Sequence, residues 1–184
     1  MISNFSEVLE AARQGDQGAW AELYDAVAAQ MLGYLRGHGA GDPEGLLGDA
    51  FLQLSRNLQT FEGDEAGFRS WAFTVAHHRL IDERRKLARR PQETEYPVTE
   101  PETPRAPADV EAEAIQAVDQ SSIEQLLNTL SEDQRDVVLL RVLGGLTTGE
   151  TAATIGKSEG AVRVLQHRAL RALKDRLTGG DVTL

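Results

Sequence analysis

Cysteine is absent from this chain of 184 residues, so neither a disulfide nor a thiolate metal site can form. Aromatic side chains are scarce at 5%, although hydrophobic residues in total reach 41%, an ordinary share for a protein with a buried core. No apolar run approaches the roughly 20 residues needed to span a bilayer, and the N-terminal residues lack a signal-peptide pattern. We therefore expect a cytoplasmic chain with no membrane insertion, no cofactor and no metal.

Proline is rare outside one segment, since five of the six prolines lie between Pro91 and Pro107. Residues 91–125 also carry nine acidic side chains and one basic one, which supplies −8 of the net charge of −10. Proline removes backbone donors, and a segment with few apolar side chains cannot offset the entropy of ordering. This pattern predicts a flexible acidic linker at residues 91–122, between domains at 1–90 and 123–178, with a tail at 179–184.

Strand-like alternation is absent as well, and the residues before the linker have the apolar spacing of helices. Apolar side chains recur at helical intervals in residues 5–12, 20–35 and 46–58, and glycines with Pro43 separate the last two segments. Residues 62–67 are typical of a loop. The predicted fold class is all-α, with two small helical domains.

Residues 68–86 combine an apolar stripe with a strongly basic flank. Phe68, Trp71 and Val75 share one helical face, and six basic side chains follow between Arg79 and Arg90. A helix anchored in a core with a basic side facing outward suits a polyanion such as DNA. Two alternatives remain open: the cations can simply complement the helix dipole, and Trp71 can stack on a base, although its spacing favours core packing.

The residues after the linker predict a helix-turn-helix. Ser131 with Gln134 and Thr147 with Glu150 form capping boxes that begin helices. Ala152 is small where helices cross, Gly156 lies at the turn, and Val162 and Leu165 face the core, which fits a recognition helix starting near residue 159. Glu159, Arg163, Gln166, His167 and Arg171 then face a major groove, and Arg168 is available to phosphates. The alternative is a plain helical hairpin with a solvated basic face.

Three motifs in this order resemble bacterial sigma-70-type initiation factors of the small extracytoplasmic-function group. Residues 42–51 resemble the polymerase-binding helix, residues 68–85 the promoter-melting helix, and residues 130–173 the domain that reads the minus-35 element. The resemblance implies a promoter-specificity subunit, not an enzyme, that binds core RNA polymerase, recognises the minus-35 and minus-10 elements and helps melt DNA. The implied partners are core RNA polymerase, promoter DNA and an anti-sigma protein.

The resemblance also assigns residues to each surface. Contacts to the minus-10 element fall to Asp64, Arg69, His77, His78, Arg79, Asp82, Arg84 and Arg85. Contacts to the minus-35 element fall to Glu159, Gly160, Arg163, Gln166, His167, Arg168 and Arg171. Polymerase binding falls to Asp42, Glu44, Leu46, Leu47, Asp49 and Phe51. Two departures stand out: Gly45 and Gly48 replace an acid and a glutamine, and His78 replaces an asparagine.

Other functions compete with this interpretation. A helix-turn-helix regulator would bind operators as a dimer without core polymerase, but it leaves the motifs at 42–51 and 68–85 unexplained. A helical metal-dependent enzyme would use His77, His78 and Asp82, although no further ligand stands at a useful spacing. A sigma-like decoy would have lost polymerase binding through the two glycines of its docking helix.

Overall fold

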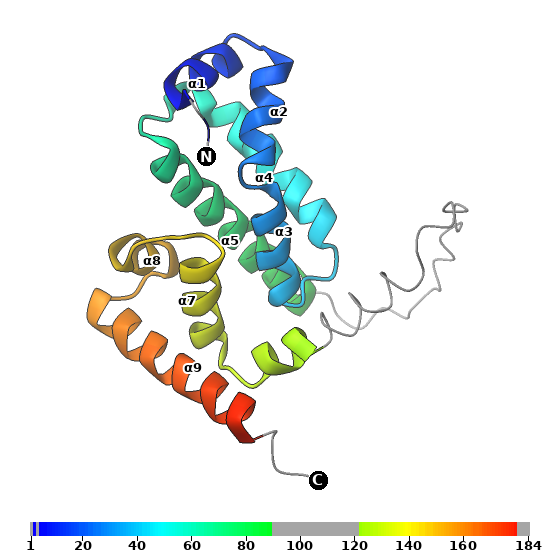
Figure 1. The fold of residues 1–184 in the computed structure, drawn as a ribbon. Coiled ribbons are helices and arrows are strands. Elements are labelled where there is room, and N and C mark those ends of the chain that lie inside the picture. Colours follow the sequence, from blue (N-terminus) through cyan, green and yellow to red (C-terminus); the bar gives the residue numbers. More distant parts are fainter. Residues whose placement is uncertain (1, 3, 90–121, 180–184) are drawn as a thin grey trace, which may run out of the picture.

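The computed structural model describes residues 2, 4–89 and 122–179, and its regular structure is helical throughout these ranges (Figure 1). The predicted linker, apart from residue 122, and the predicted tail beyond Gly179 lie outside the described residues. The expectation of an all-α fold is confirmed. The elements before the linker are α1 (Phe5–Arg13), α2 (Gln17–Asp25), α3 (Ala28–Gly37), α4 (Pro43–Asn57), the 3₁₀ turn η1 (Leu58–Thr60) and α5 (Glu65–Arg89). We call residues 4–89 the N-terminal half.

The single helix predicted over residues 20–35 is wrong, because the structure divides it into α2 and α3. Val27 leaves the helical region with φ −134° and ψ −19°. The bend lets Leu23, Val27 and Met31 all reach the core, where each is at most 1% exposed. Arg69 donates from Nη2 to the Ala26 carbonyl at 3.4 Å, which satisfies an acceptor next to the break. Tertiary packing here overrides a continuous apolar pattern.

The core of the N-terminal half is built on the long helix α5. Phe68 is fully buried and its ring lies near those of Phe5, Phe61 and Trp71, with centroids 5.9, 5.8 and 6.0 Å away. Trp71 in turn stacks on Phe61 at 5.1 Å with an interplanar angle of 12°. The interpretation of Trp71 as a packing residue is therefore confirmed for this state of the chain.

Helix α4 has a glycine, Gly48, at a position where alanine would be more stable. An added Cβ at this position meets no atom within 4 Å, and the residue is exposed on the helix surface. Glycine in a helix interior is less favourable than alanine by about 1 kcal/mol, because it loses more backbone freedom on folding. We expect Gly48→Ala to raise the free energy of unfolding by about 1 kcal/mol in urea titrations. An unchanged or lower midpoint would show that α4 is strained there in another way.

The elements after the linker form a helix-turn-helix, as predicted. Helices α7 (Glu132–Val142), α8 (Thr148–Ile155) and α9 (Glu159–Gly179) follow a short helical stretch at residues 122–128. Both capping boxes are present, at the starts of α7 and α8. Gly156 ends α8 with φ +65°, a left-handed conformation that favours glycine. Val137, Ala152 and Val162 pack together where the three helices meet. We call residues 122–179 the C-terminal half.

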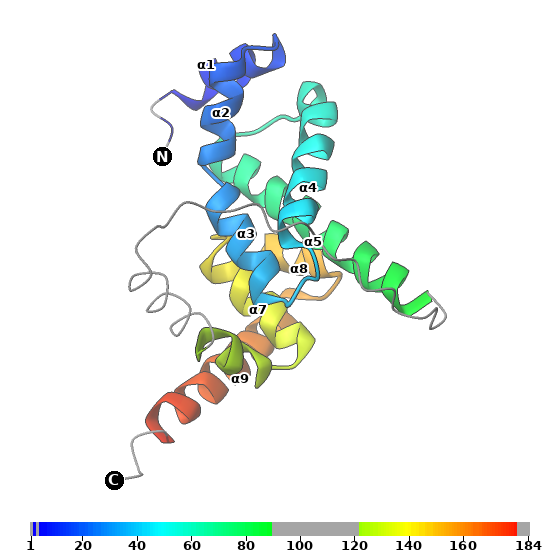
Figure 2. The ribbon, with the colours of Figure 1, turned by 90° about the vertical axis from the view of Figure 1, so that its right-hand side faces the viewer.

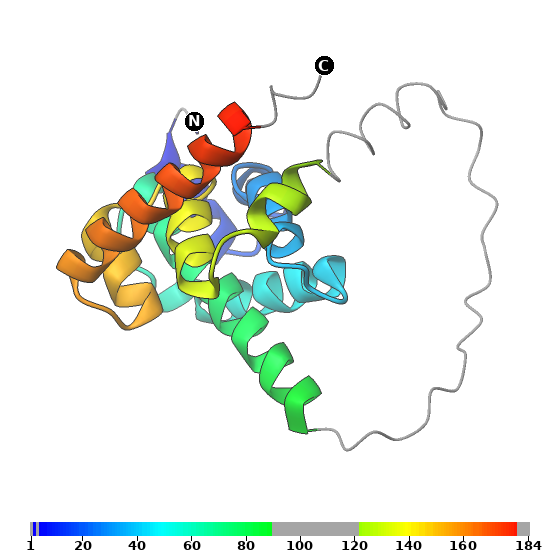
Figure 3. The same cartoon turned by 90° about the horizontal axis from the view of Figure 1, so that it is seen from below.

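The two halves share one continuous hydrophobic core (Figures 1 and 2). Helix α7 packs on α3, and α8 packs on α5. Glycines on one face of α3 allow this approach: a Cβ on Gly37 would lie 3.0 Å from Leu139 and 3.2 Å from Leu127, and one on Gly33 would lie 3.6 Å from Leu143. We call these five residues the apolar seam. Figure 3 shows that the C-terminal end of α5 projects away from this packed body.

Candidate nucleic-acid interface

Helix α9 presents the predicted minus-35 side chains to solvent. Its inner face is fixed by Val162 and Ala169, both fully buried. All seven predicted residues are on the described surface of this helix, and only Gln166 is partly covered; the exposed ones are Glu159, Gly160, Arg163, His167, Arg168 and Arg171. Arg163 makes an ion pair with Glu159 at 2.9 Å, and Arg171 one with Asp175 at 3.9 Å. Exposed pairs of this kind are weak, so both guanidinium groups can be recruited by DNA.

The predicted minus-10 residues on and near α5 differ in exposure: some face solvent and others are covered. His78, Asp82 and Arg85 are exposed, and Arg85 pairs with Asp82 at 3.7 Å. Arg79 is partly buried and donates to the side chain of Gln53 on α4. Asp64 is exposed but already accepts from the Gly67 backbone at 2.8 Å, which places it at the start of α5. His78, Arg79, Asp82 and Arg85 line one cavity together with Gln53 of α4, whereas Asp64 lies at the other end of α5.

Three of the predicted minus-10 residues are engaged inside the protein. His77 is 5% exposed, and Arg69 is bound to the carbonyl at the α2–α3 break. Arg84 donates to the His38 carbonyl at 3.1 Å and to the carboxylate of Glu132 in the C-terminal half. Sequence spacing placed these side chains on a basic flank, but it could not show which of them the second half of the chain would cover.

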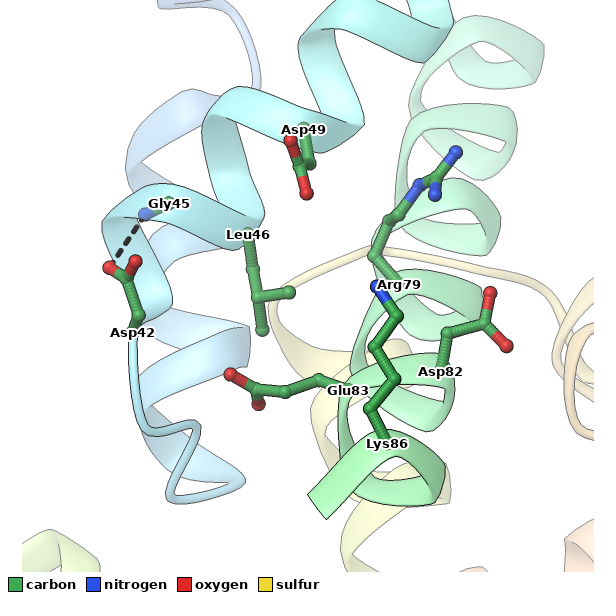
Figure 4. Close-up of a pocket in the computed structure, with 8 residues that line it drawn as sticks. All are labelled: Asp42, Gly45, Leu46, Asp49, Arg79, Asp82, Glu83 and Lys86. Atoms are coloured by element: carbon green, nitrogen blue, oxygen red, sulfur yellow. Dashed lines mark hydrogen bonds between the residues drawn. The ribbon is translucent and has the colours of Figure 1, made fainter. Parts of the chain in front are cut away.

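The predicted polymerase-binding residues of α4 likewise include both buried and exposed side chains. Leu46 and Leu47 are buried in the core, so they hold α4 in place and do not face outward. Asp42 caps the helix by accepting from the Gly45 backbone at 2.9 Å (Figure 4). Asp49 and Glu44 are exposed, and Glu44 pairs with Arg36 at 2.5 Å. Asp49 lines a cavity of about 340 Å³ between α4 and α5.

Two apolar side chains that the sequence did not mark extend the outer face of α4. Tyr24 is 42% exposed and its ring lies 4.5 Å from that of the partly buried Phe51. Leu52 is 55% exposed on the next position of α4. Large exposed apolar side chains next to one another indicate a protein contact more than a nucleic-acid contact. In the sequence, the only sign of such a contact is that each is an apolar residue lying off the buried face of its helix.

A buried group of polar side chains lies between the halves, and sequence reasoning missed it. The Tyr34 hydroxyl and His77 Nδ1 are 2.8 Å apart, and both face Asp136 of α7. Asp136 Oδ1 lies 3.3 Å from His38 Nε2 and 3.8 Å from His77 Nδ1. We call Tyr34, His38, His77 and Asp136 the polar cluster. Among the described residues, His38 Nε2 and Asp136 Oδ1 have no hydrogen-bond partner of acceptable geometry despite their proximity.

Burial shifts the ionisation of every member of the polar cluster toward the neutral form. It raises the pKa of Asp136 to about 7, an effect that nearby Arg84 partly opposes. It lowers the pKa of His38 to about 3, with a further lowering from Arg84, and that of His77 to about 4, with help from His78. The pKa of Tyr34 is raised well above its ordinary value by burial and then by Asp136. Burial therefore favours the neutral form of each group, and only Asp136, with a pKa near 7, changes its charge close to neutral pH.

The metal-dependent alternative named His77, His78 and Asp82, and the structure does not bring these residues together as a metal site. Among residues 2, 4–89 and 122–179, no three histidine, aspartate or glutamate side chains converge as metal ligands. His77, which such an enzyme would use, is buried against Tyr34.

None of the described helices is long and apolar enough to cross a membrane.

The fold and its surfaces define a class of protein: a helical DNA-binding chain that joins a helix-turn-helix to a second helical domain. Comparison with known proteins gives the family. The sequence model of Sigma-70 region 2 matches residues 19–90, and that of Sigma-70 region 4 matches residues 120–173. The chain is 34% identical to the ECF RNA polymerase sigma factor SigD of Mycobacterium tuberculosis, over 95% of this chain and 84% of the relative. It is 33% identical to the ECF sigma factor ShbA of Streptomyces griseus, over 88% of each chain.

The chain belongs to the ECF RNA polymerase sigma factors, and it is thus a promoter-recognising subunit of RNA polymerase. Among solved structures, CnrH in complex with the cytosolic domain of CnrY resembles it with a TM-score of 0.67 and 20% identity, over 96% of this chain and 99% of that one. This likeness supports the all-helical fold that the sequence predicted.

Proposed function

We propose that the chain divides promoter recognition and polymerase binding among three surfaces. The exposed side of α9 reads the minus-35 element, the surface of α5 with His78, Arg79, Asp82 and Arg85 contacts the minus-10 element, and the outer face of α4 binds core polymerase. The observation that carries this assignment is the exposure of Arg163, His167 and Arg168 on a recognition helix whose inner face is buried.

The division within the proposed minus-10 surface follows from burial. His78 and Arg85 are exposed, so they can touch DNA directly. His77 is buried against Tyr34 and acts as a positioning residue for α5. On α4, the exposed Tyr24 and Leu52 join Asp49 and Phe51 in the polymerase contact, whereas Leu46 and Leu47 only position the helix.

The minus-35 assignment predicts a specific loss when base-reading side chains are removed. Arg163→Ala and Gln166→Ala should each lower affinity for the preferred minus-35 sequence by about 1–3 kcal/mol and relax the choice of base at one position. Arg168→Ala should weaken binding to all sequences alike and reduce its salt dependence, because it contacts phosphate. The measurement is holoenzyme binding to a library of promoter fragments. The control is Arg176→Ala, at an exposed position of the same helix. Uniform effects from all four variants would contradict the assignment.

We further propose that the chain acts in the cytoplasm, performs no chemical reaction itself and is regulated by an anti-sigma protein. The structure of CnrH, which shares the fold, contains the cytosolic domain of CnrY as a partner. A screen for such a partner would use the full chain as bait, with displacement by core polymerase as the criterion. A partner that binds the holoenzyme as well as the free chain would not be an anti-sigma protein.

A further inference from the structure

Helix α9, at the edge of the molecule in Figure 1, has an exposed apolar side chain in the middle of its proposed DNA-facing side. Val164 is 49% exposed. At about 100° per residue, it points between the directions of His167 and Arg168 and close to that of Arg171. These three neighbours are exposed, whereas Val162, on the opposite side of the helix, is fully buried. Val164 therefore faces outward among side chains already assigned to the minus-35 element.

The position of Val164 along α9 also suits contact with bases. The helix begins at Glu159, so Val164 belongs to its N-terminal part, which is the part of a recognition helix that contacts base edges. Gly160, one turn earlier on the same side, has no side chain. Beyond its neighbours in the chain, a Cβ added there would meet only Ser158 Oγ, at 4.0 Å. The space beside Val164 is thus open to a base edge.

Packing within the chain does not account for valine at this position. A β-branched side chain loses rotamer freedom in a helix, so valine suits an exposed helix position less well than alanine, arginine or lysine. Burial compensates this loss at Val162, but Val164 is only half-buried. The same stiffness is useful on a binding surface, because the two methyl groups are already held in one orientation before a ligand arrives.

The chemistry of the major groove indicates what this side chain can recognise. Arginine, glutamine and histidine side chains on α9 form hydrogen bonds with bases or phosphates, and valine cannot. The apolar feature that a base pair presents in the major groove is the C5 methyl group of thymine. We propose that Val164 is a specificity-determining residue, which reads a thymine of the minus-35 element by packing against that methyl group. This inference rests on the proposed function, because it requires α9 to enter the major groove.

Deoxyuridine tests the contact, because its base differs from thymine only by the missing C5 methyl group. Each thymine of the preferred minus-35 sequence, on both strands, is replaced in turn by deoxyuridine, and holoenzyme binding to each fragment is measured. At the thymine that faces Val164, we expect the replacement to lower affinity about fourfold, which corresponds to the apolar burial of one methyl-sized group.

Val164→Ala makes the test specific to this side chain. The variant should bind the unmodified fragment about fourfold or more weakly than the wild type does. It should also lose the difference between thymine and deoxyuridine at that one position, because the two changes remove the same contact and are not additive. The fold of α9 is preserved, since alanine favours an exposed helix position more than valine does.

Leu170→Ala is the matched control. Leu170 is an apolar residue of the same helix and is 50% exposed, but it points about 120° away from Val164. Its replacement should leave the difference between thymine and deoxyuridine unchanged at every position of the minus-35 element.

Three results would overturn the inference while leaving the minus-35 assignment in place, provided that Arg163→Ala still relaxes the choice of base. One is that no thymine on either strand responds to deoxyuridine. Another is that Val164→Ala keeps the full difference between thymine and deoxyuridine. The third is that Val164→Ala weakens binding to core polymerase itself and leaves the thymine preference intact, which would assign Val164 to a protein contact. If Arg163→Ala and Gln166→Ala did not change the choice of base, the minus-35 assignment would fail, and the inference with it.

Discussion

Asp136→Asn should raise the free energy of unfolding at pH 8.5, where the wild-type fold has to bury a carboxylate, and should change it least near pH 4. The cause is Asp136, whose pKa burial raises to about 7 from an ordinary value of 3.8. A group that holds its proton more tightly in the folded state stabilises the fold below about pH 4; this contribution is lost between about pH 4 and pH 7 and does not change further above pH 7. Urea titrations of both chains between pH 4 and pH 8.5 measure the change.

The two histidines of the polar cluster set an opposite limit on the acid side. Burial lowers the pKa of His38 to about 3 and that of His77 to about 4, from 6.5. Their contribution to stability is present above pH 6.5 and is lost as the pH falls below it, because the unfolded chain then takes up protons that the folded chain excludes. The free energy of unfolding should therefore be greatest near pH 6.5.

Asp136→Asn separates these two effects. The variant cannot ionise at position 136, so it should be more stable than the wild type at pH 8.5 while still losing stability toward pH 5 through the histidines. Equal free energies of unfolding for the variant and the wild type at pH 8.5 would contradict the role given to Asp136.

The second large effect is expected in the core of the N-terminal half. Phe68→Ala should lower the free energy of unfolding by about 3–5 kcal/mol, because it removes a fully buried ring and leaves a cavity. The ring touches three other aromatic side chains, from Phe5, Phe61 and Trp71, which cannot all move to fill the space. Such a loss is a large share of the 5–15 kcal/mol typical of a domain.

Chemical denaturation of the full chain measures this loss, with Leu87→Ala as the control. Leu87 lies on the same helix but is 56% exposed, and surface substitutions usually change stability by less than about 0.5 kcal/mol. A loss below about 1 kcal/mol for Phe68→Ala would mean that the aromatic group repacks around the cavity.

Local features of the fold could be predicted from the sequence because their causes are local. The capping boxes at Ser131 and Thr147 and the turn at Gly156 each depend on a few adjacent residues, and all three appear in the structure. The exposed face of α9 follows from the same reasoning, since Val162 and Ala169 fix which side of the helix is buried.

What the sequence did not predict depends on contacts between distant residues. The polar cluster joins His38, His77 and Asp136, and no spacing rule connects positions so far apart. The break at Val27 arises because both short helices must reach one core. Leu46 and Leu47 were assigned to a partner surface because they lie in the motif at residues 42–51, yet the same apolar character places them inside.

The most direct test of promoter recognition is to mix the purified chain with core RNA polymerase, separate the mixture by size, and assay run-off transcription on genomic fragments. We predict that the chain elutes with the polymerase and that transcripts start only at fragments sharing minus-35 and minus-10 sequences. A chain that elutes apart from the polymerase and binds DNA alone as a dimer would contradict the account.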